Sequence, residues 1–338
     1  MWYEKCHVSW ISRPRKTLYF CKIEITLIFV KQKTVEIMRN NEIQKTRETR
    51  RMVSKLLLAG MMCYSFVMAH AQTFQINVND AQFTRQMLER LITEYGKVNP
   101  QFSATVVKTR EQADATVSIS EQTASVNSIG RFAIIPIANS ENEILRNKKL
   151  AKGLDNKLKH QIFVERDITD DIDDDFEEKK KLPGTVYSLT GRQSITTAIV
   201  AKELSVTPNR VKGKKIVGSE ESLISAVKSH SDAIAFNVAS LVYDANTHKP
   251  IVGLTVLPTD LDGNGKVDEA ERSAIASLDN LTAYLEKIPH TSLPTGSINI
   301  NTDNSELLKF AAWASTEGQN FIAQYGFLKA DKPLTAQK

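Results

Sequence analysis

The sequence predicts an α/β fold with a largely parallel sheet. Strand-like runs alternate with amphipathic helical patterns along residues 72–338, which is the order of elements in βαβ units. The run RFAIIPIA at 131–138 is apolar almost throughout, as strands buried on both faces of a sheet are. With 338 residues, the chain is long enough for one large domain or two medium ones.

The first elements follow from periodicity. TFQINV at 73–78 alternates and predicts a strand, and residues 84–98 predict a helix that ends at Asn99-Pro100. That helix places on one face Met87, Leu88, Leu91, Ile92 and Tyr95. FSATVV at 102–107 and ATVSIS at 115–120 predict two further strands.

The later elements continue the alternation. Ser219 is the predicted N-cap of a helix that separates two strands. The remaining elements are predicted as a helix at 154–163, strand-turn-helix at 184–204, strand-helix-strand at 215–236, a strand at 251–258, a helix at 270–288, a strand at 296–301 and a helix at 304–328.

Positive charge is confined to the N-terminal segment. Residues 1–71 contain 13 of the 44 Lys and Arg residues and 5 of the 39 Asp and Glu residues, so the remainder has a formal net charge of −3. This distribution gives no sign of a nucleic-acid partner, which would need a basic surface on the folded part. The charge run at 167–181 is interpreted as a solvated loop rather than a cation or partner site.

The segment MVSKLLLAGMMCYSFVMAHAQ, which starts at Met52, is typical of a secretory signal peptide. Basic residues precede an apolar run at 56–68, and AHA places small residues before a cleavage site after Ala71. The apolar run is too short to span a membrane. We therefore expect residues 52–71 to be a cleavable signal peptide and the mature protein to be periplasmic.

Residues 1–51 fit no fold, and we interpret them as a start-site error, with translation beginning at Met52 or Met38. The three cysteines are Cys6, Cys21 and Cys63, and all precede the predicted cleavage site. The mature chain therefore has no disulfide framework, thiol nucleophile or thiolate metal site.

Residues 260–271 read DLDGNGKVDEAE and match the calcium loop of EF-hands. Gly265 allows the sharp turn that this loop requires. The predicted ligands are the side chains of Asp260, Asp262 and Asn264, the backbone carbonyl of Lys266, a direct or water-mediated contact from Asp268 and the bidentate carboxylate of Glu271. The alternative is an acidic surface turn around Asn264-Gly265.

A calcium sensor needs a helix on each side of the loop and usually a second loop. Here a predicted strand precedes a single loop. We therefore interpret the bound Ca²⁺ as a structural clip between a strand and a helix.

The C-terminal stretch LLKFAAWASTEGQNFIAQYGFL at 307–328 resembles the terminal helix of the phosphate-binding proteins of ABC importers. The resemblance depends on Phe310, Trp313, Gly318, Gln319, Gly326, Phe327 and Leu328. LITEYGKVNP, RFAIIPIANSEN, LKHQIF and SDAIAF are similar to stretches of that family and occur in the same order, over most of 74–330.

The resemblance implies a divergent type II periplasmic binding protein. Its fold would have two α/β lobes, two crossing hinge segments and a ligand in the cleft. One lobe would contain residues 72–135 plus 245–338, and the other 136–244. The EF-hand-like calcium loop would be an insertion in one lobe, the first.

Two predicted helix starts offer free N–H groups and a positive dipole end, which bind anions. One is NDAQF at 79–83, where the candidate ligand-binding residues are Asn79, Asp80 and Ala81. The other is GRQSITT at 191–197, where the candidates are Arg192, Ser194 and Thr196. Phosphate carries a proton near neutral pH, so a selective site needs an acceptor, for which Asp80 is the candidate; its alternative role is a helix cap.

The sequence departs from the family at this site. Ile195 stands where the family has a glycine, and Arg192 lies two residues before Ser194 rather than four. The family's glycine-rich loop and its Gly-Ser-Asp segment have no counterpart between 103 and 130.

We find no catalytic motif and expect no enzymatic activity. Three hypotheses follow. The first is an exported monomer that binds phosphate or a related oxyanion and delivers it to an ABC permease. The second is a calcium-stabilised secreted structural or adhesion module with a degenerate cleft. An unrecognised hydrolase ranks lowest.

Overall fold

A computed structural model describes residues 31–33, 73–109, 113–121, 127–165, 184–190 and 195–331. The predicted signal peptide, the charge run at 167–181, Arg192 and Ser194 lie outside the described residues. The chain divides into two units, Met1–His70 and Ala71–Lys338, and the second contains the elements discussed below.

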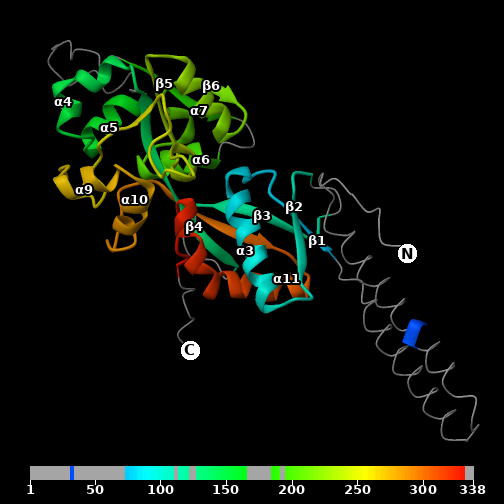
Figure 1. Cartoon of the computed structure of the whole chain (residues 1–338). Helices are drawn as coiled ribbons and strands as arrows, with labels where there is room; N and C mark the ends of the chain where they lie inside the picture. The colour runs from blue at the N-terminus through cyan, green and yellow to red at the C-terminus, as the bar shows by residue number, and fades with distance from the viewer. Residues whose placement is uncertain are drawn as a thin grey trace, which may run out of the picture. The chain divides into compact units, whose positions relative to one another are not determined.

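The second unit is a mixed α/β structure built on one curled sheet (Figure 1). Its strands are β1 (Thr73–Asn77), β2 (Ser103–Val107), β3 (Ala115–Ser120), β4 (Ser128–Asn139), β5 (Thr185–Thr190), β6 (Lys214–Val217), β7 (Ala233–Val238), β8 (Leu254–Val256), β9 (Thr295–Asn301) and β10 (Phe327–Leu328). Along the sheet the order is β2-β1-β3-β9-β4-β7-β5-β6, and β8 and β10 also pair with β4.

Helices and 3₁₀ turns connect the strands. They are η1 (Gln82–Thr84), α3 (Arg85–Val98), η2 (Glu143–Arg146), α4 (Lys148–Ala151), α5 (Asn156–Phe163), α6 (Ile195–Glu203), η4 (Pro208–Arg210), α7 (Glu220–Ser229), α8 (Ala239–Val242), α9 (Glu269–Ala274), α10 (Leu278–Leu285), α11 (Ser305–Ala314), η5 (Glu317–Phe321) and η6 (Ala323–Tyr325).

The long strand β4 divides the sheet into two halves. Its first part pairs with β9 in the half that contains β1, β2 and β3, and its second part, from Ile134, pairs with β7. The predicted α/β class and two-lobed architecture are confirmed. The boundaries predicted for the lobes stay a prediction.

The expectation of a largely parallel sheet was wrong. Parallel pairing joins β1 to β2 and β3, and β5 to β6 and β7. However, β4 is antiparallel to β7, β8, β9 and β10. A continuous apolar run indicates burial on both faces, and a central strand of a mixed sheet meets that condition as well as a parallel one.

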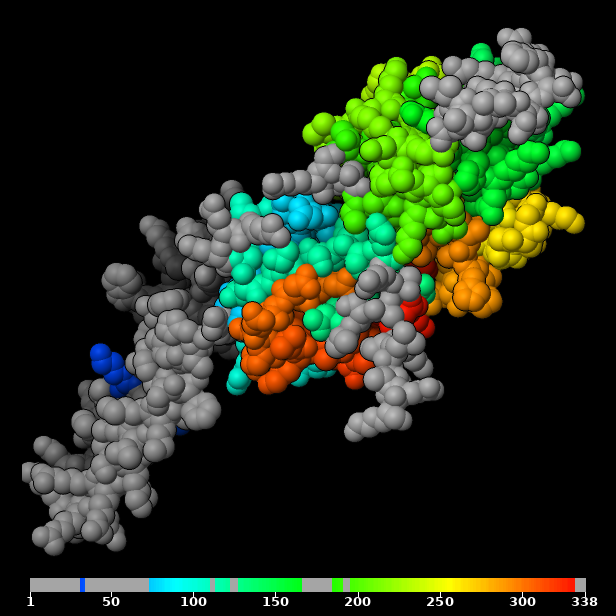
Figure 2. Space-filling view, turned by 180° about the vertical axis from the view of Figure 1, so that it is seen from behind, coloured from blue at the N-terminus to red at the C-terminus, as the bar shows by residue number. Residues whose placement is uncertain are grey.

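Two buried clusters of side chains stabilise the unit. One combines α3, β1, β3, β9 and α11 with α5 and α6, and its largest side chains include Phe132, Phe163 and Phe310. The other covers the opposite face of β4, β5 and β7 with α7, α9 and α10. In the space-filling view, the yellow and orange residues of α9 and α10 lie beside the green residues of the second half (Figure 2).

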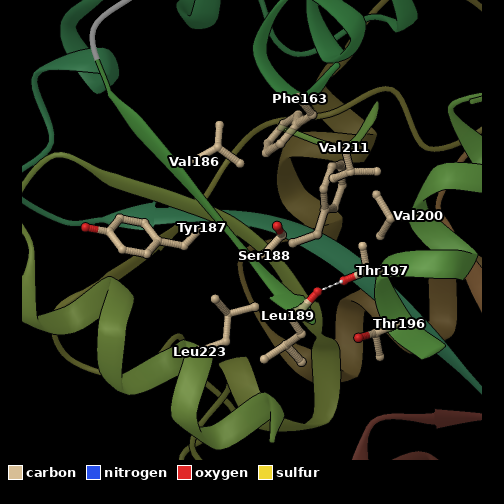
Figure 3. A pocket seen from close by; sticks show the side chains of 11 residues that line it. Phe163, Val186, Tyr187, Ser188, Leu189, Thr196, Thr197, Val200, Val211 and Leu223 are labelled. Atoms are coloured by element: carbon tan, nitrogen blue, oxygen red, sulfur yellow. Dashed lines mark hydrogen bonds between the residues drawn. The ribbon is translucent and has the colours of Figure 1, made fainter. Parts of the chain in front are cut away.

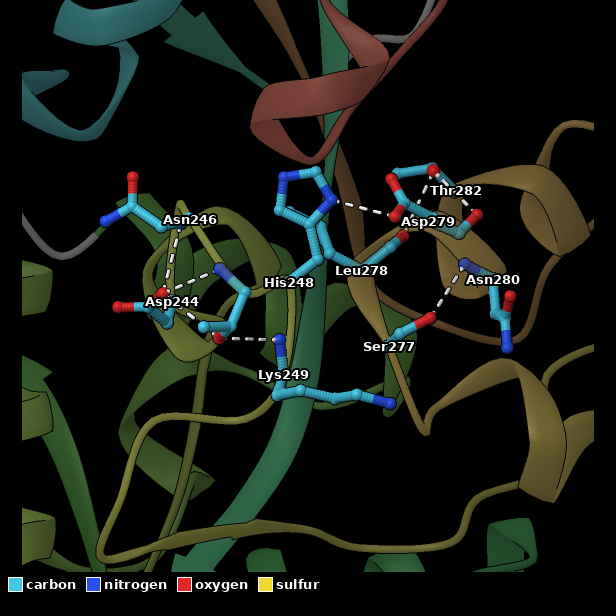
Figure 4. A network of polar contacts seen from close by, with 10 residues as sticks. Asp244, Asn246, His248, Lys249, Ser277, Leu278, Asp279, Asn280 and Thr282 are labelled. Atoms are coloured by element: carbon cyan, nitrogen blue, oxygen red, sulfur yellow. Dashed lines mark hydrogen bonds and ion pairs between the residues drawn. The ribbon is translucent and has the colours of Figure 1, made fainter.

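A polar network fixes the start of α10 (Figure 4). The backbone N–H of Leu278 donates to the carbonyl of His248 over 2.9 Å. His248 Nδ1 lies 2.8 Å from Asp279 Oδ2. Asp244 accepts hydrogen bonds from Asn246 and Thr247, which closes the turn that presents His248.

Two predicted helices end earlier than expected. The helix predicted at 270–288 is broken, because the Ser277 hydroxyl accepts from Asn280 N over 3.2 Å and starts α10 afresh. The α-helical part of the last predicted helix ends at Ala314, and the two 3₁₀ turns η5 and η6 follow it. Gly326 closes the second of these with a φ of 80°, a conformation that favours glycine.

Candidate functional site

The first predicted helix start follows β1 and is a tight 3₁₀ turn, η1, rather than the beginning of an α-helix. Asn79 and Asp80 are exposed, and Ala81 is fully buried. The Asp80 carboxylate accepts from Asn79 Nδ2 over 3.1 Å. The cap residue of η1 is Ala81, which has no side-chain cap, so the cap role considered for Asp80 is excluded.

Asn77 lies at the end of β1 and is 1% exposed. Its Oδ1 accepts from the Asn79 backbone N–H over 2.6 Å. Its Nδ2 is buried and has no hydrogen-bond partner in the described part of the chain. Sequence reasoning missed Asn77, because an asparagine at a strand end usually signals a turn.

The second predicted helix start is the first turn of α6. Thr196 is the candidate that the structure describes there, and it is 5% exposed. Its hydroxyl donates to Glu220 Oε1 over 3.2 Å. Glu220 is the first residue of α7, so the pair joins the starts of two helices.

The Thr196–Glu220 pair lies at the edge of the sheet where parallel strands end. β5, β6 and β7 run parallel, and α6, α7 and α8 follow them. Asn237, at the end of β7, donates from Nδ2 to the Glu220 carbonyl over 2.9 Å. In open α/β sheets, ligands bind at the carboxyl ends of strands, where helix N-termini point.

Glu220 is a buried carboxyl, 6% exposed. The pKa of Glu220 is raised to about 7, mainly by burial and slightly by the charge of Glu221, while its own backbone N–H and the Thr196 hydroxyl lower it. The charged residues that act on this pKa include no lysine or arginine from the described part of the chain. Strongly shifted carboxyls of this kind are common at functional sites.

A narrow cavity lies beside the pair, between β5, α6 and α7 (Figure 3). Its polar lining comes from Ser188, Thr196 and Thr197. The Thr197 hydroxyl donates to the carbonyl of Leu189 over 3.0 Å and so holds α6 to β5. The two neighbouring threonines therefore have different partners, a carboxylate and a backbone carbonyl.

An apolar bridge connects the two predicted helix starts. Phe83 in η1 contacts Phe132 on β4, with ring centroids 5.0 Å apart. Phe132 and Ile199 of α6 both lie against Gly296 on β9, where a Cβ atom would be 2.6 Å from the ring and 2.8 Å from Ile199 Cδ1. Phe83 of η1 and Ile199 of α6 therefore both approach the part of the sheet that contains Phe132 and Gly296.

The predicted calcium loop lies between β8 and α9. The expected order of strand, loop and helix is confirmed. Carboxylate oxygens of Asp260, Asp262 and Glu271 lie within 4.8 Å of one another. Within the described residues, this is the one group of three or more His, Cys, Asp or Glu side chains close enough to hold a metal ion.

Backbone amides shape the loop around its first aspartate. Asp260 Oδ1 accepts from Gly263 N over 2.7 Å, and Oδ2 accepts from Gly265 N over 2.8 Å. Both glycines have positive φ, 79° and 83°. A residue with a side chain is strained in that conformation, so the two glycines are required by the turn.

The other predicted ligands have distinct roles. Asn264 Oδ1 accepts from the backbone N–H of Lys266. Asp268 Oδ1 accepts from Glu271 N over 2.9 Å and is the N-cap of α9. The Glu271 carboxylate accepts from Leu261 N over 2.6 Å and from Asp268 N over 2.9 Å. The donor set is oxygen-rich and fits a hard cation such as Ca²⁺.

A buried lysine lies behind the loop. Lys159 of α5 is 2% exposed, and its ammonium donates to the carbonyls of Asp260 and Ser292 and to the Ser292 hydroxyl. Burial lowers its pKa, and the charges of Asp260, Glu203 and Glu271 oppose that shift. The loop is thereby attached to α5 and to the segment that leads into β9.

Neither a protein-family model nor a curated protein sequence matches the chain. Similar solved structures include a Clostridium perfringens protein assigned as a phosphate ABC transporter substrate-binding protein, with bound phosphate (TM-score 0.49, 13% identity, 77% of this chain and 100% of that one). Others are an ABC-type phosphate transport receptor from Vibrio cholerae (0.42, 13%, 76% and 99%) and full-length OxyR from Pseudomonas aeruginosa (0.42, 12%, 88% and 88%). None of the helices described is long and apolar enough to cross a membrane.

Proposed function

We propose that this protein is an exported, periplasmic solute-binding protein that captures phosphate or a related oxyanion between its two lobes for an ABC-type importer. The observation that supports this most directly is the meeting of the α6 and α7 starts at the Thr196–Glu220 pair. Aligned N–H groups at helix starts hold anions without a basic side chain. The order of sequence motifs described above agrees with this function.

In this proposal the anion lies at the start of α6. Thr196 supplies a hydroxyl, and Arg192 and Ser194 supply a guanidinium and a second hydroxyl. Asn79, Asp80 and Ala81 contribute from the opposite lobe. The described contacts place Asn79 and Asp80 at an exposed turn next to Asn77, whose buried amide nitrogen has no hydrogen-bond partner among the described residues.

Isothermal titration of the full chain with phosphate, and with sulfate for comparison, tests the proposal. We expect saturable phosphate binding close to one-to-one. Thr196→Val removes the hydroxyl from the site and should weaken phosphate binding about tenfold or more. Thr197→Val is the matched control, because this hydroxyl binds the Leu189 carbonyl; it should lower stability and leave affinity unchanged. Equal phosphate affinities in the wild type, Thr196→Val and Thr197→Val would contradict the placement of the anion beside Thr196.

We also propose that the loop at 260–271 binds one structural Ca²⁺. Asp260, Asp262, Asn264 and Glu271 would supply side-chain oxygens, and Lys266 and Asp268 would complete the set as in EF-hands. The supporting observation is the cluster of three carboxylates that backbone amides already hold in place.

A second candidate function is a calcium-stabilised secreted structural module without an anion ligand. Two observations favour this alternative. The Thr196 hydroxyl already donates to Glu220, and Ile195 stands where the resembled family has a glycine. A protein that Ca²⁺ stabilises against heat, and that takes up neither phosphate nor sulfate, would establish it.

A further inference from the structure

A basic hollow lies between α4 and the first turns of α5, and it shares no residue with the site at the starts of α6 and α7. Its volume is about 260 Å³, and its polar lining consists of Lys149, Lys152, Asp155, Lys157 and Gln161. Lys149 and Lys152 are three residues apart at the end of α4, and Lys157 and Gln161 are four residues apart on α5. Residues at these spacings share a helix face, so positive side chains border the basic hollow from two helices.

The positive charge at this place is a local concentration. Residues 146–159 contain six lysine or arginine residues and one acidic residue, whereas residues 72–338 have a formal net charge of −3. In the basic hollow, three ammonium groups against one carboxylate leave a formal net charge of +2. A concave surface lined by one sign of charge focuses the electric field and attracts ions of the opposite sign.

The three lysines have no partner of their own. Lys149, Lys152 and Lys157 are exposed, and their ammonium groups form no hydrogen bond or ion pair with any other residue that the structure describes. The Asp155 carboxylate is engaged elsewhere, since it accepts from the backbone N–H of Leu158 over 2.7 Å as the N-cap of α5. The ammonium groups are therefore available to a ligand.

Backbone contacts fix the floor of the basic hollow. Leu154 N donates to the Pro258 carbonyl over 2.7 Å, and the Leu154 carbonyl accepts from Asp260 N over 3.0 Å. Gly153 has a φ of 101°, and a Cβ atom there would collide with Val267 Cγ2. The turn between α4 and α5 is thereby held against the loop at 260–271, and a preformed surface of this kind lowers the cost of binding.

We infer that the basic hollow is a second anion site, which binds a compact, soluble polyanion with at least two phosphate groups. Lysine ammonium groups bind phosphate as point charges. Pyrophosphate spreads its charge over two linked phosphates, so it can meet ammonium groups from both helices at once. The concave shape favours a small ligand over a flat membrane, because small molecules bind in hollows of about 300–1,000 Å³. The inference does not depend on the proposed function.

Isothermal titration of the full chain with pyrophosphate tests the inference. The buffer is calcium-free, because pyrophosphate itself binds Ca²⁺, and it contains excess inorganic phosphate to fill the proposed phosphate site. The wild type and Thr196→Val should both bind pyrophosphate close to one-to-one. The triple variant Lys149→Gln, Lys152→Gln, Lys157→Gln removes the three charges, so its affinity should fall about ten- to a hundredfold.

The matched control is the triple variant Lys108→Gln, Lys228→Gln, Lys287→Gln. It removes the same charge from three exposed lysines outside the basic hollow, and its affinity should stay within about twofold of the wild type because salt screens distant charges. Thermal unfolding confirms that each variant is folded. An equal loss of affinity in the two triple variants would overturn the inference.

A wild type that does not bind pyrophosphate would also overturn the inference. If that protein instead bound phosphatidylglycerol vesicles, and the substitutions in the basic hollow abolished this binding, the partner would be a membrane surface. The proposed function is tested separately, by the titration with phosphate alone. A wild type that binds pyrophosphate and does not bind phosphate would support the second anion site and contradict the proposed function.

Discussion

At the residue scale, Glu220 makes stability depend on pH. Its pKa of about 7 lies above the ordinary value of 4.5, so folding favours the protonated form. The stabilising contribution is therefore fully present below the unfolded pKa and is lost as pH rises through about 7. A shift of this size corresponds to roughly 3 kcal/mol.

Glu220→Gln should remove this dependence. Urea denaturation at pH 5 and pH 8 should show that the wild type loses up to about 3 kcal/mol of unfolding free energy more than the variant between the two pH values. Glu221→Gln should keep most of the dependence, because burial and not the charge of Glu221 is the main cause of the raised pKa. Parallel pH profiles for the wild type and Glu220→Gln would show that the pKa of the carboxyl is the same in the folded and the unfolded protein.

Gly296 is a second residue at which a small change has a large expected effect. A Cβ atom there would lie 2.6 Å from the Phe132 ring and 2.8 Å from Ile199 Cδ1. Gly296→Ala should lower the unfolding free energy by about 1–3 kcal/mol, because the apolar bridge has no room for a methyl group.

Gly96→Ala is the control for that experiment. The nearest atom to its new methyl group would be the Phe102 carbonyl oxygen at 3.8 Å, and alanine favours the helix by about 0.5–1 kcal/mol. Thermal unfolding of both variants should therefore give opposite shifts. A Gly296→Ala protein as stable as Gly96→Ala would contradict the close packing of α6 against β9.

At the element scale, the loop between β8 and α9 allows the stabilisation by a bound ion to be measured separately from the stabilisation by the loop's own hydrogen bonds. Glu271 binds both backbone amides and the proposed ion, so its removal should destabilise the protein with or without calcium. Asp262 is exposed, and the described hydrogen bonds of its carboxylate are to Asn264 alone. Substitution of Asp262 is therefore a better test of ion binding than substitution of Glu271.

Asp262→Ala should therefore act only through calcium. Ca²⁺ should raise the melting temperature of the wild type, since a ligand that binds the native state stabilises it. The variant should lose most of that increase and melt with the wild type in chelator. Glu269→Ala, an exposed acid of the same loop that is not a predicted ligand, should keep the full increase. A calcium response in Asp262→Ala equal to that of the wild type would argue against this ligand set.

At the scale of the whole molecule, the loop is fastened to two distant parts of the chain. Asp260 N donates to the Leu154 carbonyl over 3.0 Å, and Ser292 N donates to the Leu261 carbonyl over 2.9 Å. Ile134, where β4 passes from one half of the sheet to the other, donates to the Pro294 carbonyl over 2.8 Å. The loop therefore contacts the return segment that leads into β9, next to the crossing of the two halves.

Calcium should consequently slow amide exchange beyond the loop itself. Hydrogen–deuterium exchange with and without Ca²⁺ should show added protection in peptides that cover 257–261 and 288–294. A peptide from α3, whose described hydrogen bonds do not involve the loop, should exchange at the same rate in both conditions. Protection confined to 262–268 would mean that the ion orders the loop without affecting its attachments.

The sequence by itself determined which segments form strands and helices and where a calcium loop can lie. Period-two and period-3.6 patterns are local, as are the Asp-x-Asp-x-Asn-Gly spacing and the Ser219 cap, so a short window contains the information. It also predicted Thr196 as part of a helix start, because the turn before α6 follows a clear strand.

Tertiary structure alone decided the direction of pairing along β4, the break between α9 and α10, and the partners of the buried polar groups. Glu220 lies 24 residues from Thr196, and Lys159 lies 133 from Ser292. Contacts of that separation leave no periodic trace. An acidic side chain at a helix start usually faces water and interacts favourably with the helix dipole. Only the tertiary structure shows that Glu220 is buried and contacts Thr196.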